Sequence, residues 1–337
     1  MAPLFTANWF NFGRNPSAGG ASGFSATGGT KDSSTRTGWT LHVFTASGSL
    51  VCTGSEQKTY EILAIGGGGG GGTSVEPGSS GGGGGGAGCL KYLQPTVKLT
   101  AGSTYPVTVG EGGAGAVPGT SNARGNEGEN TVWGHPGDPI TAPAGGYGGG
   151  SSPNPQPNNA GGAGGSSGGS GNQSGTNYGC FACEGTKNHP GNADAVSPAN
   201  GWGNDGGGIT PPGTGPSYSG AGGGGAVNGG TNGTQESASG VGGSGARFSF
   251  LPPTVGAPGP SPTHRYVAGG GGGSSYDNTR HGADGGTGGG GHGGSGGTND
   301  APFNATATTG AGGGGSSMGQ TAGSGADGLV VIMYPDS

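Results

Sequence analysis

The sequence has few charged residues, no basic cluster and no long hydrophobic run. Asp, Glu, Lys and Arg make up 8% of the 337 residues, and the formal net charge is -6. Without a concentrated basic patch, binding to nucleic acid is not expected. The longest apolar stretches, of about seven residues, are far shorter than the roughly 20 residues that a membrane-spanning helix needs. The N-terminal sequence MAPLFTANWFNFG has no charged leader and no long apolar segment, so we expect no signal peptide.

Apolar side chains are also scarce, and glycine takes their place. Apolar residues, alanine included, account for 27% of the chain, while 96 residues are glycine and 24 are proline. This composition cannot build an ordinary hydrophobic core for the whole chain. Disordered chains are usually rich in charge, and this one is not, so the composition does not indicate simple disorder either.

Strand-like patterns are confined to the two ends of the chain. Residues 39–65 and 89–109 show apolar residues alternating with polar ones between short turns, and a short strand is expected at 130–133. The alternation then nearly vanishes until the C-terminal sequence GLVVIMYP, whose residues 329–334 are the most strand-like run. A strand so far from the others has no local partner, so we expect it to pair back into the N-terminal sheet. The intervening chain would then be an insertion held at both ends, which lowers the entropic cost of ordering it.

The insertion is interrupted by runs of glycine. Six runs of four or more glycines occur, at residues 66–72, 81–86, 222–225, 269–273, 288–291 and 312–315. An extended helix with three residues per turn has no internal hydrogen bonds, so its backbone groups can pair with neighbours on all sides. Only glycine lets backbones approach that closely. We therefore predict polyglycine II rods, with 66–72 and 81–86 as an antiparallel rod hairpin, interior rods of pure glycine, and peripheral rods with Ser, Ala, Asn or Thr on one face.

Two other glycine-rich architectures fit less well. Collagen requires a strict Gly-X-Y period, which is absent, and calcium-binding β-roll repeats would need serial copies of a motif that His281 to Gly286 supplies only once and poorly. The predicted fold class is therefore an all-β strand domain clamping a layered polyglycine II helix bundle, with no α-helix of note. We expect the strand domain to cover residues 39–133 and 328–335, including a first rod hairpin at 66–88, and the bundle with exposed loops to cover residues 134–327.

The order of these motifs resembles a known family. HVFTASGSLVC, then YEILAIGGGGGGG, then TYPVTVGEGGAG, glycine-rich tracts with loops and a closing GLVVIMYP are similar to the glycine-rich domain of tailed-phage virion proteins, over about residues 38–335. In the relatives that are distal adhesins of long tail fibres, the resemblance implies a sandwich of polyglycine II helices whose variable loops bind a receptor on the host. It implies synthesis in the host cytoplasm, incorporation into a virion, and a host surface glycan or outer-membrane protein as partner.

One departure from the adhesins concerns residues 1–38, which are too few for a large attachment domain. They form instead a short aromatic peptide that we expect to dock on another virion protein of the tail fibre, tail or capsid. The residues expected to carry that contact are Leu4, Phe5, Trp9, Phe10 and Phe12. A capsid- or tail-mounted decoration protein without receptor binding is therefore the alternative function, a homo-oligomer is compatible with either, and an ice-binding protein is a more distant third possibility.

Candidate receptor-binding residues lie in the segments richest in aromatic and polar side chains. Such side chains stack on sugars and hydrogen-bond to their hydroxyl groups or to receptor loops. The competing interpretation is that the aromatic rings simply cover the ends of the rods. The candidates are Phe248, Phe250, His264, Arg265, Tyr266, Tyr276, Asp277, Arg280 and His281.

The cysteines offer little chemistry. Cys180 and Cys183, followed by His189, form the only compact metal-like motif, but zinc requires four ligands, so no metal is expected there and a local disulfide or two loop thiols are the alternatives. Cys52 and Cys89 are expected to be small buried residues of the strand domain. No catalytic triad, paired carboxylate motif or phosphate-binding loop with its lysine is present, so we expect neither an enzyme nor a cofactor.

Overall fold

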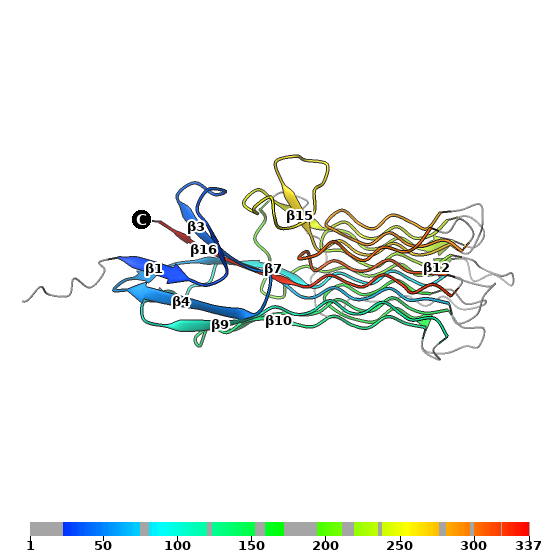
Figure 1. Ribbon diagram of the computed structural model, residues 1–337, viewed down its shortest axis with the longest axis horizontal. Coiled ribbons are helices and arrows are strands. Elements are labelled where there is room, and N and C mark those ends of the chain that lie inside the picture. Colours follow the sequence, from blue (N-terminus) through cyan, green and yellow to red (C-terminus); the bar gives the residue numbers. More distant parts are fainter. Residues whose placement is uncertain are drawn as a thin grey trace, which may run out of the picture.

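All regular elements of the described part of the protein are β-strands (Figure 1). The computed structural model describes residues 23–74, 81–119, 123–151, 159–171, 194–210, 219–234, 238–275, 281–296, 300–317 and 319–336. Over these ranges no helix is long and apolar enough to cross a membrane. The strands are β1 (Phe24–Thr27), β2 (Thr30–Asp32), β3 (Trp39–Phe44), β4 (Gly48–Gly54), β5 (Gln57–Lys58), β6 (Glu61–Ile65), β7 (Leu90–Leu93), β8 (Leu99–Thr100), β9 (Thr104–Thr108), β10 (Thr131–Trp133), β11 (Ile140–Ala142), β12 (Ile209–Thr210), β13 (Gly233–Thr234), β14 (Ala246–Phe248), β15 (Arg265–Val267) and β16 (Leu329–Pro335).

Two five-stranded sheets make up the strand domain at one end of the molecule (Figure 1). The first sheet has the order β1-β4-β9-β10-β11, and the second has the order β2-β3-β16-β6-β7. One hydrophobic cluster lies between the sheets and contains Leu50 and Trp133 from the first sheet and Ile62 and Ile332 from the second. Burial of these side chains is the main stabilising contribution in this domain.

The C-terminal strand pairs with N-terminal strands, as the sequence predicts, and it lies in the middle of the second sheet. In β16, Val331 pairs with Val43 of β3 on one side and with Leu63 of β6 on the other. Its odd-numbered residues face one cluster and its even-numbered residues face the other, so both faces of the strand are buried. A strand buried on both faces requires apolar residues throughout, which explains the unbroken run LVVIM.

The strand domain begins earlier than the sequence predicts. The segment expected to be a docking peptide, residues 1–38, contains β1 and β2, which pair with β4 and β3 respectively. Residues 24–32 are therefore part of the two sheets. The prediction missed these strands because FSAT and TKD are only four and three residues long and are surrounded by Gly and Ser. Their strand geometry comes from pairing with longer strands.

The glycine run that follows β6 forms a rod, residues 66–73, that is hydrogen-bonded with a three-residue repeat. Its amides at 66, 69 and 72 donate to one neighbour, those at 67, 70 and 73 to a second, and those at 68 and 71 to a third, over 2.6 to 3.1 Å. Its carbonyls accept from three further neighbours in the same rotation. The six surrounding segments are 83–89, 123–129, 323–326, 113–116, 145–151 and 313–316. This repeat is the one expected of an extended helix with three residues per turn.

The second rod, residues 81–89, runs antiparallel to the first. Gly69 donates to the Gly86 carbonyl and Gly72 donates to the Gly83 carbonyl, so residue numbers rise along one rod as they fall along the other. This confirms the predicted antiparallel return, although its connecting residues 75–80 lie outside the described ones. The second rod also pairs on all sides, with residues 66–72, 143–149, 166–169, 221–224, 271–274 and 310–316.

Interior rod positions have no space for a side chain. A Cβ added to Gly69 would lie 2.1 Å from the Gly146 carbonyl oxygen, and one added to Gly84 would lie 2.1 Å from that of Gly271. These contacts are with the backbone of neighbouring rods, which cannot rotate away as a side chain can. Glycine is therefore required here by the close approach of backbones.

Peripheral rods carry side chains on one outward face. Along residues 111–117 the burial repeats every three residues: Glu111, Ala114 and Val117 are exposed, and Gly113 and Ala116 are buried. This rod and the one at 123–129 lie within the range that the sequence assigns to the strand domain, while β11 lies within the range assigned to the bundle. The two regions thus interleave along the chain more than the predicted boundaries allow.

Candidate functional site

The end of the glycine bundle remote from the sheets is closed by buried hydroxyl side chains. Isolated bridges join Ser74 to Ser151, Ser219 to Ser275, and Ser275 to Ser295, and Ser317 pairs with Gly81. All these serines are at most 5% exposed. We call this group, Ser74, Ser151, Ser219, Ser275, Ser295 and Ser317, the serine layer.

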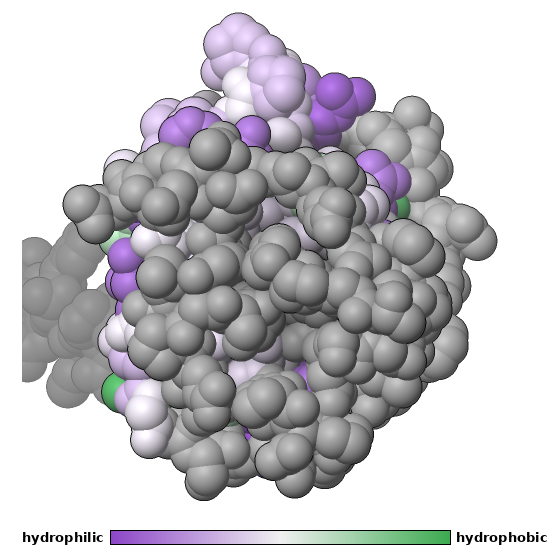
Figure 2. Space-filling view, turned by 90° about the vertical axis from the view of Figure 1, so that its right-hand side faces the viewer, coloured by the Kyte–Doolittle hydropathy of each residue, from purple (hydrophilic) through white to green (hydrophobic). Residues whose placement is uncertain are grey.

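The serine layer lies at the ends of the described parts of several rods. Residues 75–80, 152–158, 211–218, 276–280, 297–299 and 318 follow or precede its rods and lie outside the described residues. The described residues that flank these segments all meet at this distal end (Figure 1). Figure 2 views the molecule from that side, and the coloured residues around its outline are mostly hydrophilic or near neutral.

Several candidate residues lie outside the described part of the chain. Among the receptor-binding candidates these are Tyr276, Asp277 and Arg280. The virion-docking candidates Leu4, Phe5, Trp9, Phe10 and Phe12 and the weak metal candidates Cys180, Cys183 and His189 are also in this group. Their assignments stay predictions.

The structure places Phe248 and Phe250 in a hydrophobic core. Phe248, in β14, is 0% exposed and Phe250 is 3% exposed, and both rings lie within 6 Å of Tyr92, at 5.6 and 5.3 Å between centroids. Their cluster covers the outer face of the second sheet, at the end of the bundle opposite to the serine layer. These two rings are therefore packing residues that a receptor cannot reach.

Three further candidates hold the same β14–β15 hairpin together. Arg265 donates to the carbonyls of Val255 and Gly256 over 3.1 and 2.6 Å, and the hydroxyl of the buried Tyr266 accepts from the Ser261 amide. His264 Nδ1 lies 2.8 Å from the Ser261 hydroxyl. The hairpin projects sideways near the sheets (Figure 1). The polar groups of these residues thus serve the fold of a lateral loop rather than the distal end.

His281 is the one described candidate near the serine layer. Its Nδ1 lies 3.5 Å from Asp300 Oδ2, and its side chain is 75% exposed. Beside it, His292 Nε2 lies 3.5 Å from Asp284 Oδ1. A pocket of about 470 Å³ opens among these rods and is lined by Ala238, Ser239, Val241, His281, Gly282, Ala283, Asp284 and His292.

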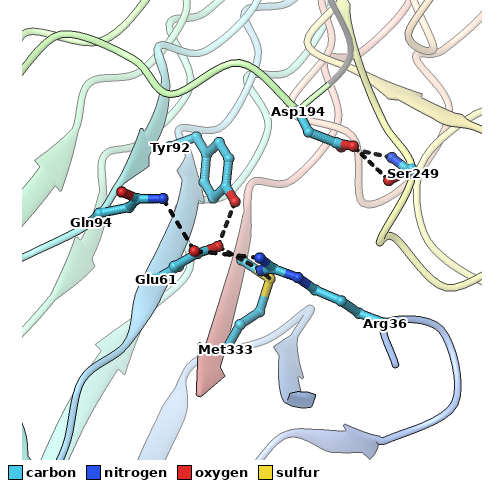
Figure 3. Close-up of polar contacts among 7 residues, drawn as sticks. All are labelled: Arg36, Glu61, Tyr92, Gln94, Asp194, Ser249 and Met333. Atoms are coloured by element: carbon cyan, nitrogen blue, oxygen red, sulfur yellow. Dashed lines mark hydrogen bonds and ion pairs between the residues drawn. The ribbon is translucent and has the colours of Figure 1, made fainter. Parts of the chain in front are cut away.

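A buried polar network that the sequence analysis did not identify lies near the sheets (Figure 3). Glu61, in β6, is 8% exposed and accepts from Arg36 and from the Tyr92 hydroxyl, both over 2.5 Å, and from Gln94 over 3.1 Å. Burial and the adjacent carboxylate raise the pKa of Tyr92. Burial lowers the pKa of Arg36, but the hydrogen bond that it donates to Glu61 and the negative charge of Glu61 outweigh this and raise the pKa. The only sequence signal was one glutamate at the start of the buried strand EILAI.

The Arg36 side chain also links the β2–β3 loop to the rest of the network. Its guanidinium lies 3.8 Å from the centroid of the Trp39 ring and 3.6 Å from the Met333 sulfur. Nearby, Asp194 accepts from the amide and hydroxyl of Ser249, which fastens residue 194 to the β14–β15 hairpin (Figure 3). All these polar groups are paired with one another, which is the arrangement of a structural network.

The two described cysteines lie buried, as predicted, and form no disulfide. Burial raises the pKa of the Cys52 thiol to about 11, and the Cys89 thiol donates to the Asn200 carbonyl. Within the described ranges, no three His, Cys, Asp or Glu side chains are grouped so that they could hold a metal ion.

Comparison with known proteins identifies the family. No curated protein matches the chain. The glycine-rich domain family matches residues 45–335, a range that begins just after β3, ends with β16, and includes the glycine bundle and all strands from β4 onward. The chain belongs to the glycine-rich domain family.

Proposed function

We propose that this protein is a virion component that recognises the host cell surface through the segments at the distal end of its glycine bundle. In this role it would act as a receptor-binding adhesin or fibre tip, with a host glycan or outer-membrane protein as its partner. The strand domain and the aromatic N-terminal peptide would face other virion proteins.

The observation that carries the proposal is that the described rod ends bordering these segments meet at one end of the bundle. Ser74, Ser151, Ser219, Ser275 and Ser317 are buried and bridged to one another or to a neighbouring rod, and each adjoins a segment of different composition. A rigid lattice that holds the starting points of several unlike segments close together is typical of scaffolds that carry recognition loops. The motif order that resembles tailed-phage glycine-rich domains supports the virion setting.

The experiment replaces residues 276–280, the sequence YDNTR, by Gly-Ser-Gly-Ser-Gly in virions and measures adsorption to host cells. We expect adsorption to fall at least about tenfold, because the replacement removes aromatic and charged groups while the adjoining Ser275 and its lattice bonds remain. The control changes Glu56 to Ser in the exposed turn after β4, at the opposite end of the molecule.

Two outcomes bear on the alternative function. Equal adsorption after replacement of 276–280, and separately of 152–158 and 211–218, would contradict host recognition and support a decoration protein. In either case, deletion of residues 1–20 should remove the protein from virions if the aromatic peptide docks it, and continued incorporation would refute the docking role.

A further inference from the structure

A side pocket just below the serine layer is built on the three-residue repeat of the peripheral rods. With three residues per turn, positions i and i+3 share a face and lie about 9 Å apart along the rod. His281 and Asp284 are such a pair, and both are exposed while Gly282 and Ala283 between them are buried. Asp300 and Phe303 form a second pair on a nearby rod. The lattice therefore presents these four side chains in fixed rows.

Backbone hydrogen bonds set these rods in order. The Gly242 amide donates to the Asp284 carbonyl, the Gly293 amide donates to the Ala283 carbonyl, and the Phe303 amide donates to the His292 carbonyl, over 2.9 to 3.0 Å. Four rods thus lie side by side. In this order they carry the side chains of Val241, Asp284, His292 and Phe303. The pocket of about 470 Å³ lies among the first three. Its shape depends on the backbone lattice and not on long side chains.

The side chains around the pocket combine an apolar ring with hydrogen-bonding groups. Phe303 is 58% exposed, and its ring centroid lies 5.9 Å from that of His292, which orients it beside the pocket. The Asp284 carboxylate is 85% exposed, and the Ser239 hydroxyl is buried at the pocket wall with no hydrogen-bond partner among the described residues. The exposed ring can pack against an apolar surface of a ligand, and the unpartnered hydroxyl can form a hydrogen bond with it.

These groups match the chemistry of a sugar. The C–H face of a pyranose stacks on an aromatic ring, while its hydroxyl groups donate to carboxylates and exchange hydrogen bonds with imidazole and hydroxyl groups. The carboxylates of Asp284 and Asp300 make the surroundings negative, which disfavours anionic sugars and phosphate. The pocket volume of about 470 Å³ falls within the range of small-ligand sites. The pocket is open on one side, so the terminal unit of an oligosaccharide can enter it.

We propose that this pocket, between His281, Asp284 and His292 and beside Phe303, binds a neutral saccharide unit. The proposal rests on the proposed function, because it makes the pocket a lateral subsite for a host surface glycan whose other part contacts the distal segments. Val241, which is 44% exposed, supplies a second apolar contact at the pocket wall.

The test titrates the full-length protein with methyl glycosides of glucose, galactose, mannose and N-acetylglucosamine, and with the methyl glycoside of sialic acid, by saturation-transfer NMR. At least one neutral glycoside should bind, the sialoside should not, and Phe303→Ala and Asp284→Asn should each weaken binding about tenfold. Both changes leave the backbone bonds of their rods in place. The matched controls are Val117→Ala and Glu111→Gln on another outer rod, which should leave binding unchanged.

The proposal is overturned if no neutral glycoside binds, or if binding is the same in Phe303→Ala, Asp284→Asn and the controls. It is also overturned if the His281 and His292 resonances respond to Zn²⁺ alone and to none of the sugars. Loss of adsorption on replacing residues 276–280, with no glycoside binding, would refute the pocket and leave the proposed function standing. Glycoside binding with unchanged adsorption in Phe303→Ala and in the 276–280 replacement would refute the recognition role but not the saccharide site.

Discussion

The strand domain and the glycine bundle stabilise themselves in opposite ways. Between the two sheets, Leu50, Ile62 and Trp133 are at most 1% exposed and fill the space with side chains. In the bundle, Gly69 and Gly84 are also buried, but the space is filled by neighbouring backbones whose amides and carbonyls pair with each other. The first region gains stability from apolar burial and the second from a lattice of hydrogen bonds worth about 0.5–1.5 kcal/mol net each.

A single methyl group therefore has opposite effects on stability in the two regions. In the strand domain a methyl group contributes to burial, so removing one destabilises the fold. In the bundle interior there is no space for a methyl group, so adding one destabilises the fold. The regions meet where alanines replace glycines in the rods: Ala87 and Ala226 are buried and belong to the cluster that covers the second sheet.

The largest effect is expected from Gly84→Ala, which tests the lattice directly. The added Cβ would lie 2.1 Å from the Gly271 carbonyl oxygen, so two rods must separate and several hydrogen bonds must break. We expect a loss of more than about 4 kcal/mol in unfolding free energy, or failure to fold. Denaturant unfolding and hydrogen exchange over residues 81–89 would measure it.

The matched control for that prediction is Gly137→Ala in the strand domain. There the nearest atoms to the added Cβ lie 3.5 Å away, which is ordinary contact, so the change should alter unfolding free energy by no more than about 1 kcal/mol. Equal effects of the two substitutions would break the comparison between the regions.

Leu63→Ala in β6 should have the next largest effect and should act on the strand domain. Leu63 is 0% exposed and packs with Val43 and Val331 in one cluster, so its truncation leaves a cavity and should cost about 2–5 kcal/mol. Calorimetry and denaturant unfolding would measure the loss. The exposed Val117→Ala in a peripheral rod is the matched control and should change the unfolding free energy by less than about 0.5 kcal/mol.

Arg36→Ala should have a smaller effect and should weaken the polar network where the strand domain meets the β14–β15 hairpin. Glu61 would lose its cation and keep only the Tyr92 and Gln94 hydrogen bonds. Because Arg36 is 26% exposed, we expect a loss of about 1–3 kcal/mol rather than the full cost of a buried pair. Lys31→Ala in the adjacent strand β2, a change at an exposed position, should be nearly neutral in the same denaturation assay. Equal losses from the two substitutions would contradict the role given to the network.

The smallest effect is a pH dependence from Asp32, in the short strand β2. Burial raises its pKa, but hydrogen bonds from Thr35 and Ser34 outweigh this and lower it from 3.8 to about 2. Because the folded-state pKa lies below that of the unfolded chain, the stabilisation is complete above pH 4 and is lost as the pH falls through 2. After discounting for partial exposure we expect about 1 kcal/mol. Unfolding curves of Asp32→Asn should lack this component, and an unchanged acid limb would refute the assignment.

Much of the strand domain was predictable because its patterns are local. The alternation in β3 and the apolar run of β16 identify strands from a few neighbouring residues. The isolation of β16 in the chain predicted its return to the N-terminal sheet, while the structure shows that its partners are β3 and β6. The rods were predictable from steric argument alone, because a run of seven glycines has few ordered alternatives.

The candidate site was less predictable, because burial is decided by distant parts of the chain. Phe248 and Phe250 had the composition of a binding loop, yet they pack on Tyr92, more than 150 residues earlier in the sequence. The sequence did not predict the pocket at His281, Asp284 and His292, because distant parts of the chain form it. Its rods contact one another only within the lattice, and the spacing of three that aligns its side chains is common in a glycine-rich chain.

Short-range repeats in the sequence specify the apolar strands and the rods built from glycine runs, but not the short strands β1 and β2 or the peripheral rods at 111–117 and 123–129. Only the tertiary structure decided which rods lie inside, with six hydrogen-bonded neighbours, and which lie at the edge with side chains facing outward. The physical reason is that a rod has no internal hydrogen bonds and takes its partners from anywhere in the chain. The neighbours of residues 66–73 come from as far as residues 323–326, and no local pattern specifies that choice.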